Sequence, residues 1–204
     1  MINLERAKEK FKNHVATFKD YGNLKVLDFK NPDTLNYRIR FIFEEDYCKL
    51  HISGDLGELI ASNYGNMTYE KFNDFVNNIG YFEGKIDCHS RRIYVYDEDD
   101  AKEDLKEYFI ENDIYDDIVS DKYEWETEEE KIDEVIDNIL EDFSFETGIG
   151  SKGYDALTEY VDDAWEIASD LGKRETKILE LYTLAFKLAQ EKLKTVSKGT
   201  EDRR

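Results

Sequence analysis

The spacing of apolar residues predicts a mixture of helices and strands in the first half of the chain. A stripe that recurs every three or four residues predicts an amphipathic helix over residues 3–19. The residues of this stripe are Leu4, Ala7, Phe11, Val15 and Phe18. Residues 37–43 alternate instead, with Tyr37, Ile39, Phe41 and Phe43 on one face, which is typical of a half-buried strand. Further strands are predicted over 24–29, 47–53, 59–61 and 92–96, and a helix capped by Thr68 over 68–78.

Helical patterns dominate the second half. Asp97 is expected to cap one helix, and 127–143, 154–171 and 174–195 are expected to form three more. The expected buried side of helix 127–143 consists of Ile132, Val135, Ile136, Ile139, Leu140 and Phe143. A flexible joint is expected at Gly148, Gly150 and Gly153.

These elements predict an α+β fold. Residues 1–112 are expected to form a lobe with an antiparallel sheet and flanking helices, and 113–196 an acidic, all-helical lobe. Residues 197–204 are expected to be a disordered tail.

The charge distribution limits the kinds of partner that the protein can bind. The net charge is −20, and residues 97–170 hold 29 Asp/Glu against 5 Lys/Arg, a net of −24. The remainder holds 19 acidic and 23 basic residues, a net of +4. Such a chain repels nucleic acid and anionic membranes and favours a basic protein partner. The two cysteines, and the lack of an apolar run of about 20 residues or an N-terminal signal segment, favour the cytoplasm.

One acidic stripe is the candidate binding site. Carboxylates on helix 127–143 recur every three or four residues opposite its apolar side, about 4.5–6 Å apart at a rise of 1.5 Å per residue. This ladder resembles the phosphate spacing of a nucleic-acid backbone. The predicted partner-binding residues are Glu128, Glu129, Glu130, Asp133, Glu134, Asp137, Glu141 and Asp142. A solvated helix face is the ordinary alternative for any one such cluster.

The sequence contains three patterns that are compared with those of metal or catalytic sites. Cys48-x-x-His51 with Cys88-His89 suggests zinc, but Cys48 and His51 would point to opposite faces of strand 47–53. Glu83 and Lys85, with Asp74 or Asp55 upstream, are typical of a metal-dependent nuclease, although Gly84 interrupts the segment. Asp97–Asp100 lacks the glycine of a calcium loop. We therefore predict no catalytic residue, no metal and no cofactor.

A stretch from Tyr37 to about Phe109 resembles small proteins of phages and prophages of Gram-positive bacteria. The residues that carry the resemblance are Tyr37–Arg40, His51–Glu58 and Tyr81-Phe82-x-x-Lys85. Such genes often accompany counter-defence functions, and the acidic segment is similar in design to several anti-CRISPR proteins. The resemblance implies neither a particular target nor functional residues.

Charge and resemblance together predict an inhibitor that acts in the host bacterial cytoplasm. Its acidic lobe would occupy the basic nucleic-acid channel of a defence nuclease, with a Cas9-type CRISPR effector as the first target. Two alternatives stay open. The chain would be a metal-dependent nuclease that uses Asp74, Glu83 and Lys85, or a structural or regulatory phage protein whose charge only keeps it in solution.

Overall fold

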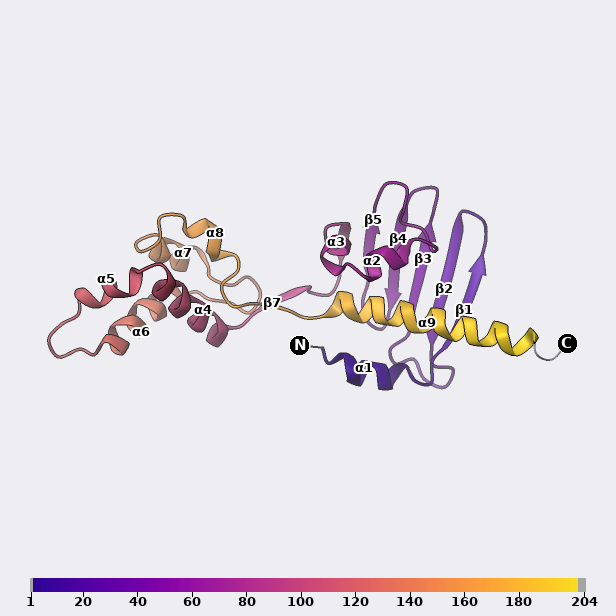
Figure 1. The fold of residues 1–204 in the computed structure, drawn as a ribbon, viewed down its shortest axis with the longest axis horizontal. Helices are drawn as coiled ribbons and strands as arrows, with labels where there is room; N and C mark the ends of the chain where they lie inside the picture. Colours follow the sequence, from indigo (N-terminus) through magenta and orange to yellow (C-terminus); the bar gives the residue numbers. More distant parts are fainter. Residues whose placement is uncertain (1, 202–204) are drawn as a thin grey trace. The chain divides into compact units, whose positions relative to one another are not determined.

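The computed structural model describes residues 2–201, with side chains described for residues 2–195. The chain divides into two compact units. Unit 1 consists of the residues up to Ile93 together with those from Lys177 onward, and unit 2 is Tyr94–Thr176. Unit 2 is therefore an insertion in the sequence of unit 1, and the fold as a whole is α+β (Figure 1).

Unit 1 contains a six-stranded antiparallel sheet in which the strands lie side by side in the order in which they occur in the sequence. Its strands are β1 (Val15–Asp20), β2 (Leu24–Lys30), β3 (Ile39–Glu44), β4 (Lys49–Gly54), β5 (Leu59–Ser62) and β6 (Ile86–His89). On β3, Ile39, Phe41 and Phe43 are fully buried, which confirms the predicted alternation from Ile39 onward. Tyr37, placed on this strand by the sequence, precedes it and has a φ of 61°.

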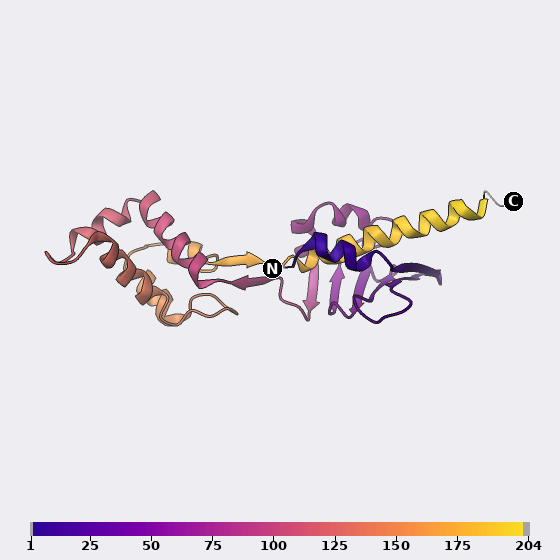
Figure 2. The same cartoon turned by 90° about the horizontal axis from the view of Figure 1, so that it is seen from below.

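Helices cover the apolar face of this sheet. They are α1 (Leu4–Phe11), α2 (Phe72–Val76), α3 (Ile79–Glu83) and the long α9 (Ile178–Glu201). Figure 2 shows the α1 and α9 ribbons on the same side of the strands. The ring of Phe186 on α9 meets those of Phe41 and Phe72 at centroid distances of 5.4 and 4.8 Å, so α9 closes the core.

Three sequence-based predictions for unit 1 are wrong in detail. The expected helix over 3–19 ends at Phe11, and Val15–Asp20 is the edge strand β1, paired with β2. Val15 and Phe18 satisfy a helical spacing, but the pairing with β2 decides their conformation. Strand β6 was not predicted, because its side chains are half-buried or exposed and give no apolar pattern. The expected helix over 68–78 is confined to the short α2, and a second short helix, α3, follows it beyond the predicted range.

Unit 2 combines a short antiparallel ribbon with helices around a second core. The ribbon pairs β7 (Tyr94–Tyr96) with β8 (Lys173–Glu175). The helices are α4 (Glu98–Glu111), α5 (Ile114–Ser120), α6 (Glu128–Ile139), α7 (Ser151–Leu157) and α8 (Ala164–Ala168). The predicted buried side of α6 is confirmed for Ile132, Val135, Ile136, Ile139 and Leu140, whereas Phe143 is half-buried.

The predicted domain division differs from the structure. The acidic region begins at Tyr94, not at 113, and ends at Thr176, because the last helix packs into the core of unit 1. Unit 2 is also not all-helical, since β7 and β8 form its ribbon. Of the expected disordered tail, residues 197–201 continue α9, and residues 202–204 lie outside the described residues.

Candidate partner-binding site

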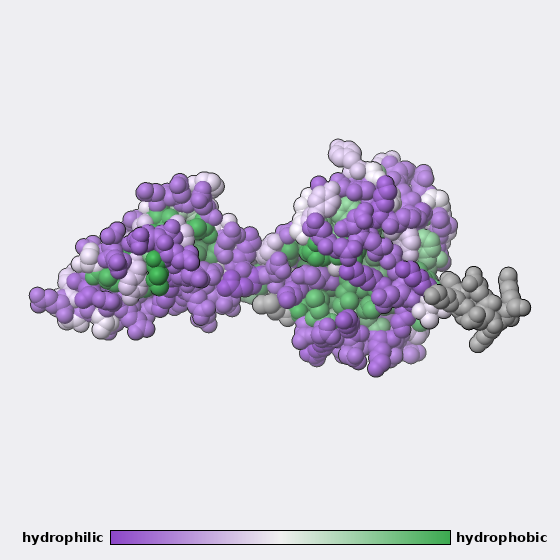
Figure 3. All heavy atoms as spheres, in the orientation of Figure 1, coloured by the Kyte–Doolittle hydropathy of each residue, from purple (hydrophilic) through white to green (hydrophobic). Residues whose placement is uncertain are grey.

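Unit 2 contains nearly all of the negative charge. It has 30 Asp/Glu against 7 Lys/Arg, a net of −23, whereas the rest of the chain has 18 against 21, a net of +3. In Figure 3, hydrophilic residues cover most of the visible surface of this unit. The division into units 1 and 2 therefore separates the charge about as completely as the division into residues 97–170 and the remainder.

The start of α6 is fixed by a capping box. The Thr127 hydroxyl accepts the Glu130 N–H at 3.2 Å, and the Glu130 carboxylate accepts the Thr127 N–H at 2.9 Å. The carboxylate accepts hydrogen bonds from the Thr127 backbone N–H and, at 2.9 Å, from the Thr127 hydroxyl, and these two bonds lower the pKa of Glu130. Glu130 is exposed, as predicted, but its carboxylate also holds the first turn of the helix.

Four of the predicted carboxylates form ion pairs with lysines inside unit 2. Asp133 and Asp137 pair with two lysines of α4, and Glu134 and Glu141 pair with lysines of α6 and α7. The pairs and their N–O distances are Asp133–Lys106 at 2.7 Å, Asp137–Lys102 at 2.9 Å, Glu134–Lys131 at 3.1 Å and Glu141–Lys152 at 3.0 Å. Hydrogen bonds to the partner carboxylates raise the pKa of Lys102, Lys131 and Lys152. The stripe is therefore partly neutralised from within.

Asp142 has a structural role that the sequence did not predict. Its carboxylate accepts the backbone N–H groups of Gly150, Lys152 and Gly153, each at 3.0 Å. Partial burial acts to raise its pKa, but these three hydrogen bonds outweigh burial and lower it. A Cβ at Gly153 would lie 2.1 Å from the carbonyl oxygen of Ile139, so this glycine allows a close approach. The expected flexible joint is thus a hydrogen-bonded turn.

Several carboxylates that point to solvent without a described lysine partner lie at the α5–α6 end. Glu128 and Glu129 are exposed, and within the described part of the chain neither pairs with a lysine or arginine. Other exposed acids of this end are Asp116, Asp117, Asp121 and Glu124. Lys122 is the single basic residue between 107 and 130. This end is the strongest candidate for a contact with cations.

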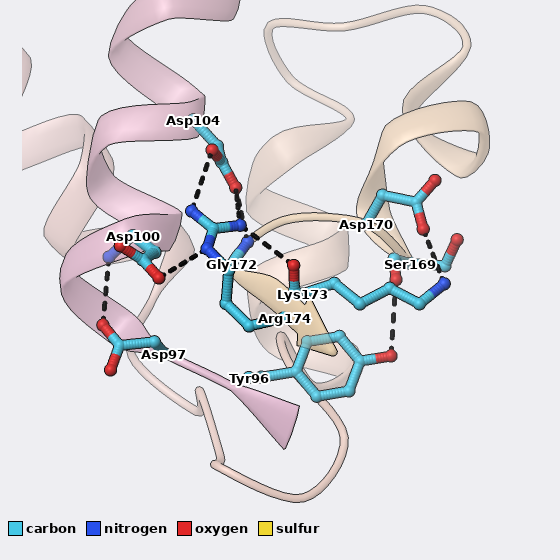
Figure 4. A network of polar contacts seen from close by, with 9 residues as sticks. All are labelled: Tyr96, Asp97, Asp100, Asp104, Ser169, Asp170, Gly172, Lys173 and Arg174. Atoms are coloured by element: carbon cyan, nitrogen blue, oxygen red, sulfur yellow. Dashed lines mark hydrogen bonds and ion pairs between the residues drawn. The ribbon is translucent and has the colours of Figure 1, made fainter. Parts of the chain in front are cut away.

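Other carboxylates of unit 2 connect α4 to strand β8 and the residue before it. Arg174 on β8 bonds Asp100 and Asp104 of α4, and Asp104 also accepts the Gly172 N–H at 2.7 Å (Figure 4). Asp97 caps α4, as predicted, by accepting the Asp100 N–H at 3.1 Å. Arg174 is the one arginine between 94 and 176, which was the available signal for a structural role. Its pairing with α4 could not be predicted, because the two are far apart in the sequence.

The candidate metal sites do not assemble. Among residues with described side chains, no group of three or more His, Cys, Asp or Glu is placed to hold a metal ion. Asp74 lies on α2 and Glu83 ends α3, while the ammonium of Lys85 sits 4.8 Å from the Tyr81 ring centroid. Cys48 lies in a turn before β4, at a φ of 50°, rather than in the strand as expected.

A shallow cleft of about 380 Å³ lies on the sheet of unit 1. Its lining is Asp28, Lys30, Arg38, Arg40, Ser53, Gly54 and Glu58. Arg40 is held by Asp28 through two N–O contacts of 2.6 and 3.0 Å. Because carboxylates and cations alternate here, the cleft presents no uniform charge to a ligand.

Exposed aromatic residues of unit 2 were missed by the sequence analysis. Tyr123 and Trp125, between α5 and α6, are 62% and 82% exposed, and Trp165 on α8 is 65% exposed. Large aromatic side chains are usually buried, and in interfaces they are enriched among the residues that dominate binding. Two tryptophans in an acidic segment were the available signal.

Comparisons with protein-family models, curated proteins and solved structures give no match. Of the helices in the described residues, none is long and apolar enough to cross a membrane. The chemistry of the chain's own residues is therefore the basis for assigning a function.

Proposed function

We propose that the chain is a non-catalytic inhibitor whose unit 2 occupies the Lys/Arg-rich nucleic-acid channel of another protein. The observation that carries the proposal is the net charge of −23 in a unit with its own core, beside a remainder of +3. Charge that served solubility alone would not need to be confined to one inserted unit. The target is a defence nuclease of the bacterial host cytoplasm, and a Cas9-type effector is the first to test, because its heteroduplex lies in a basic channel.

The mechanism is charge complementarity. Crowded carboxylates repel one another, so a basic channel gains binding free energy by relieving that repulsion and by releasing counterions. The internal lysine pairs alter the expected contact surface: Glu128 and Glu129, with Asp116, Asp117 and Glu124, lead the contact. Asp133, Glu134, Asp137 and Glu141 contribute by exchanging their lysines for cations of the partner.

The test compares two variants with the same change in net charge. One carries Asp116→Asn, Asp117→Asn, Glu124→Gln, Glu128→Gln and Glu129→Gln in unit 2. The matched control neutralises five exposed acids of unit 1, namely Glu5, Glu9, Asp33, Asp46 and Glu191. Both are assayed for binding to a purified Cas9–guide complex and for protection of target DNA from cleavage.

We expect the unit 2 variant to lose affinity at least about fivefold, since each of the five exposed pairs contributes roughly 0.2–1 kcal/mol. The control should keep wild-type affinity, and wild-type binding should weaken steeply with added salt. Equal affinity of the two variants, with unchanged circular dichroism, would exclude charge complementarity in unit 2. If the wild-type chain binds neither this nor any other nucleic-acid enzyme in host lysate, the chain is a structural or regulatory protein instead.

A further inference from the structure

Two aromatic rings are stacked at an exposed turn of unit 2. The rings of Tyr123 and Trp125 are nearly parallel, with an interplanar angle of 2° and a centroid distance of 4.8 Å. Trp125 is 82% exposed although Tyr123 covers part of it, so its other face is open to solvent. When no other protein covers it, this face of Trp125 exposes apolar surface that folding alone does not require.

The turn that carries the stack is held in place by local hydrogen bonds. The N–H of Glu126 donates to the carbonyl oxygen of Tyr123 at 3.0 Å, and the N–H of Tyr123 donates to the Glu126 carboxylate at 3.2 Å. The capping box of Thr127 and Glu130 then fixes the next residues at the start of α6. Because these bonds form within the free chain, a partner meets rings that are already ordered, and binding costs less conformational entropy.

Carboxylates surround the aromatic turn. Asp121, Glu124, Glu128 and Glu129 are exposed within a few residues of Trp125. An anionic rim excludes phosphate and acidic peptides, and an open indole face attracts a cation with a flat, weakly hydrated surface. The arginine guanidinium fits both features, because it stacks on aromatic faces while its N–H groups bond carboxylates. A lysine ammonium satisfies the charge and is attracted to a ring, but it has no flat surface to stack on the indole.

We propose that the Tyr123–Trp125 stack is an arginine-binding anchor, with a partner's guanidinium lying on the open face of Trp125 and bonded by the neighbouring carboxylates. This anchor rests on the proposed function and specifies it: the basic surface that unit 2 recognises presents an arginine, not merely positive charge. Aromatic anchors of this kind are common among the few residues that dominate an interface.

The experiment uses the full chain and two labelled peptides of equal length and charge, nona-arginine and nona-lysine, at about 0.15 M salt. In a Trp165→Phe background, Trp125 is the one tryptophan left, so its fluorescence reports the turn directly. We expect arginine to bind about two- to fivefold more tightly than lysine, as an exposed cation–π contact predicts, and to change Trp125 emission. Trp125→Ala should abolish this preference while the salt-dependent binding of both peptides persists.

Trp165→Ala is the matched control, because Trp165 is also an exposed tryptophan of unit 2 and has acidic neighbours. It should keep the preference for arginine. Equal affinity for the two peptides, or a preference that survives Trp125→Ala, overturns the arginine anchor and leaves the proposed function intact. Failure of both peptides to bind overturns both proposals. A nuclease that still binds the five-carboxylate variant but no longer binds Trp125→Ala overturns charge complementarity and the carboxylate bonds of the anchor, and leaves only the contact with the Trp125 ring.

Discussion

The hydroxyl of Tyr182 donates a hydrogen bond to the main-chain carbonyl oxygen of Leu56 at 3.0 Å, although 126 residues separate the two. Tyr182 is 1% exposed, and burial raises its pKa to about 12, so the hydroxyl stays protonated and remains a donor at neutral pH. The bond fixes α9, which follows the inserted unit 2, to the turn before β5.

Tyr182→Phe should therefore destabilise the protein without changing its fold. The ring keeps its packing, but the carbonyl of the half-buried Leu56 loses its donor, which costs about 0.5–1.5 kcal/mol, the net contribution of a typical hydrogen bond. Urea unfolding followed by circular dichroism should show a lower midpoint at an unchanged slope. Tyr64→Phe, at a fully exposed tyrosine, should leave the midpoint where it is. Equal midpoints for wild type and Tyr182→Phe would show that the bond adds nothing.

Removing the α4–α6 ion pairs should also lower stability. Asp133→Asn with Asp137→Asn leaves Lys106 and Lys102 without their partners, at a cost of roughly 0.4–2 kcal/mol for two exposed pairs. Relief of the diffuse repulsion in unit 2 acts in the opposite direction over longer distances. We expect the close pairs to dominate at about 0.15 M salt, where the longer-range repulsion is screened, and the effect to fade in 1 M salt.

Glu159→Gln with Asp162→Asn is the control for this pair of substitutions. It makes the same charge change at exposed acids of unit 2 for which no lysine partner is described. This variant should be as stable as wild type or slightly more so. A greater loss of stability in the control than in the Asp133 and Asp137 variant would contradict the role assigned to the lysines.

His14 should make stability depend on pH below neutrality. It is 2% exposed, and its Nε2 donates to the Tyr37 carbonyl at 3.2 Å. Its Nδ1 has no hydrogen-bond partner among the described residues. Burial lowers its pKa, so the unfolded chain binds a proton more readily than the folded chain. Stability should fall as the pH drops below about 6.5, by at most about 1.4 kcal/mol per pH unit.

The measurement is the difference in unfolding free energy between pH 7.5 and pH 5.5 for wild type and His14→Phe. Carboxylates titrate in both proteins, so subtracting one difference from the other isolates the histidine. Wild type should lose more stability than the variant over this interval. An identical pH dependence for wild type and His14→Phe would mean that His14 accepts a proton in the folded state.

Unit 1 should fold without unit 2. Tyr94 and Glu175 are direct partners in the β7–β8 ribbon, so the two ends of the insertion are adjacent. Replacing residues 95–174 by Asn-Gly, which favours a two-residue hairpin turn, should leave the sheet and α9 intact. Circular dichroism should show a single cooperative unfolding transition. The product should bind neither basic peptide, because the negative charge has been removed. A product that fails to unfold cooperatively would show that unit 1 depends on the insertion.

Local patterns determined several elements correctly. Strand β3 was predicted because Ile39, Phe41 and Phe43 alternate over a run that one face buries. Helix α6 was predicted because its apolar stripe has helical spacing. The separation of charge was also visible, because net charge is a property of the sequence.

The first helix shows where such patterns fail. Val15 and Phe18 fit the helical spacing that begins at Leu4, yet they lie on strand β1. Their backbone groups bond β2, a neighbour that no window of the sequence contains. Strand β6 gives no signal for a related reason: pairing with β5, not burial, defines it.

For the candidate site, the sequence by itself determined that the negative charge is regional, and that carboxylates line one face of α6. Only the tertiary structure decided which of them remain available to a partner. Lys102 and Lys106 reach Asp137 and Asp133 from another helix, and Asp142 bonds the backbone of a turn. The stacking of Tyr123 on Trp125 likewise depends on a turn closed by its own hydrogen bonds. Composition fixes how much charge a segment has. Contacts between residues that are distant in the sequence decide which of its carboxylates remain available to a partner.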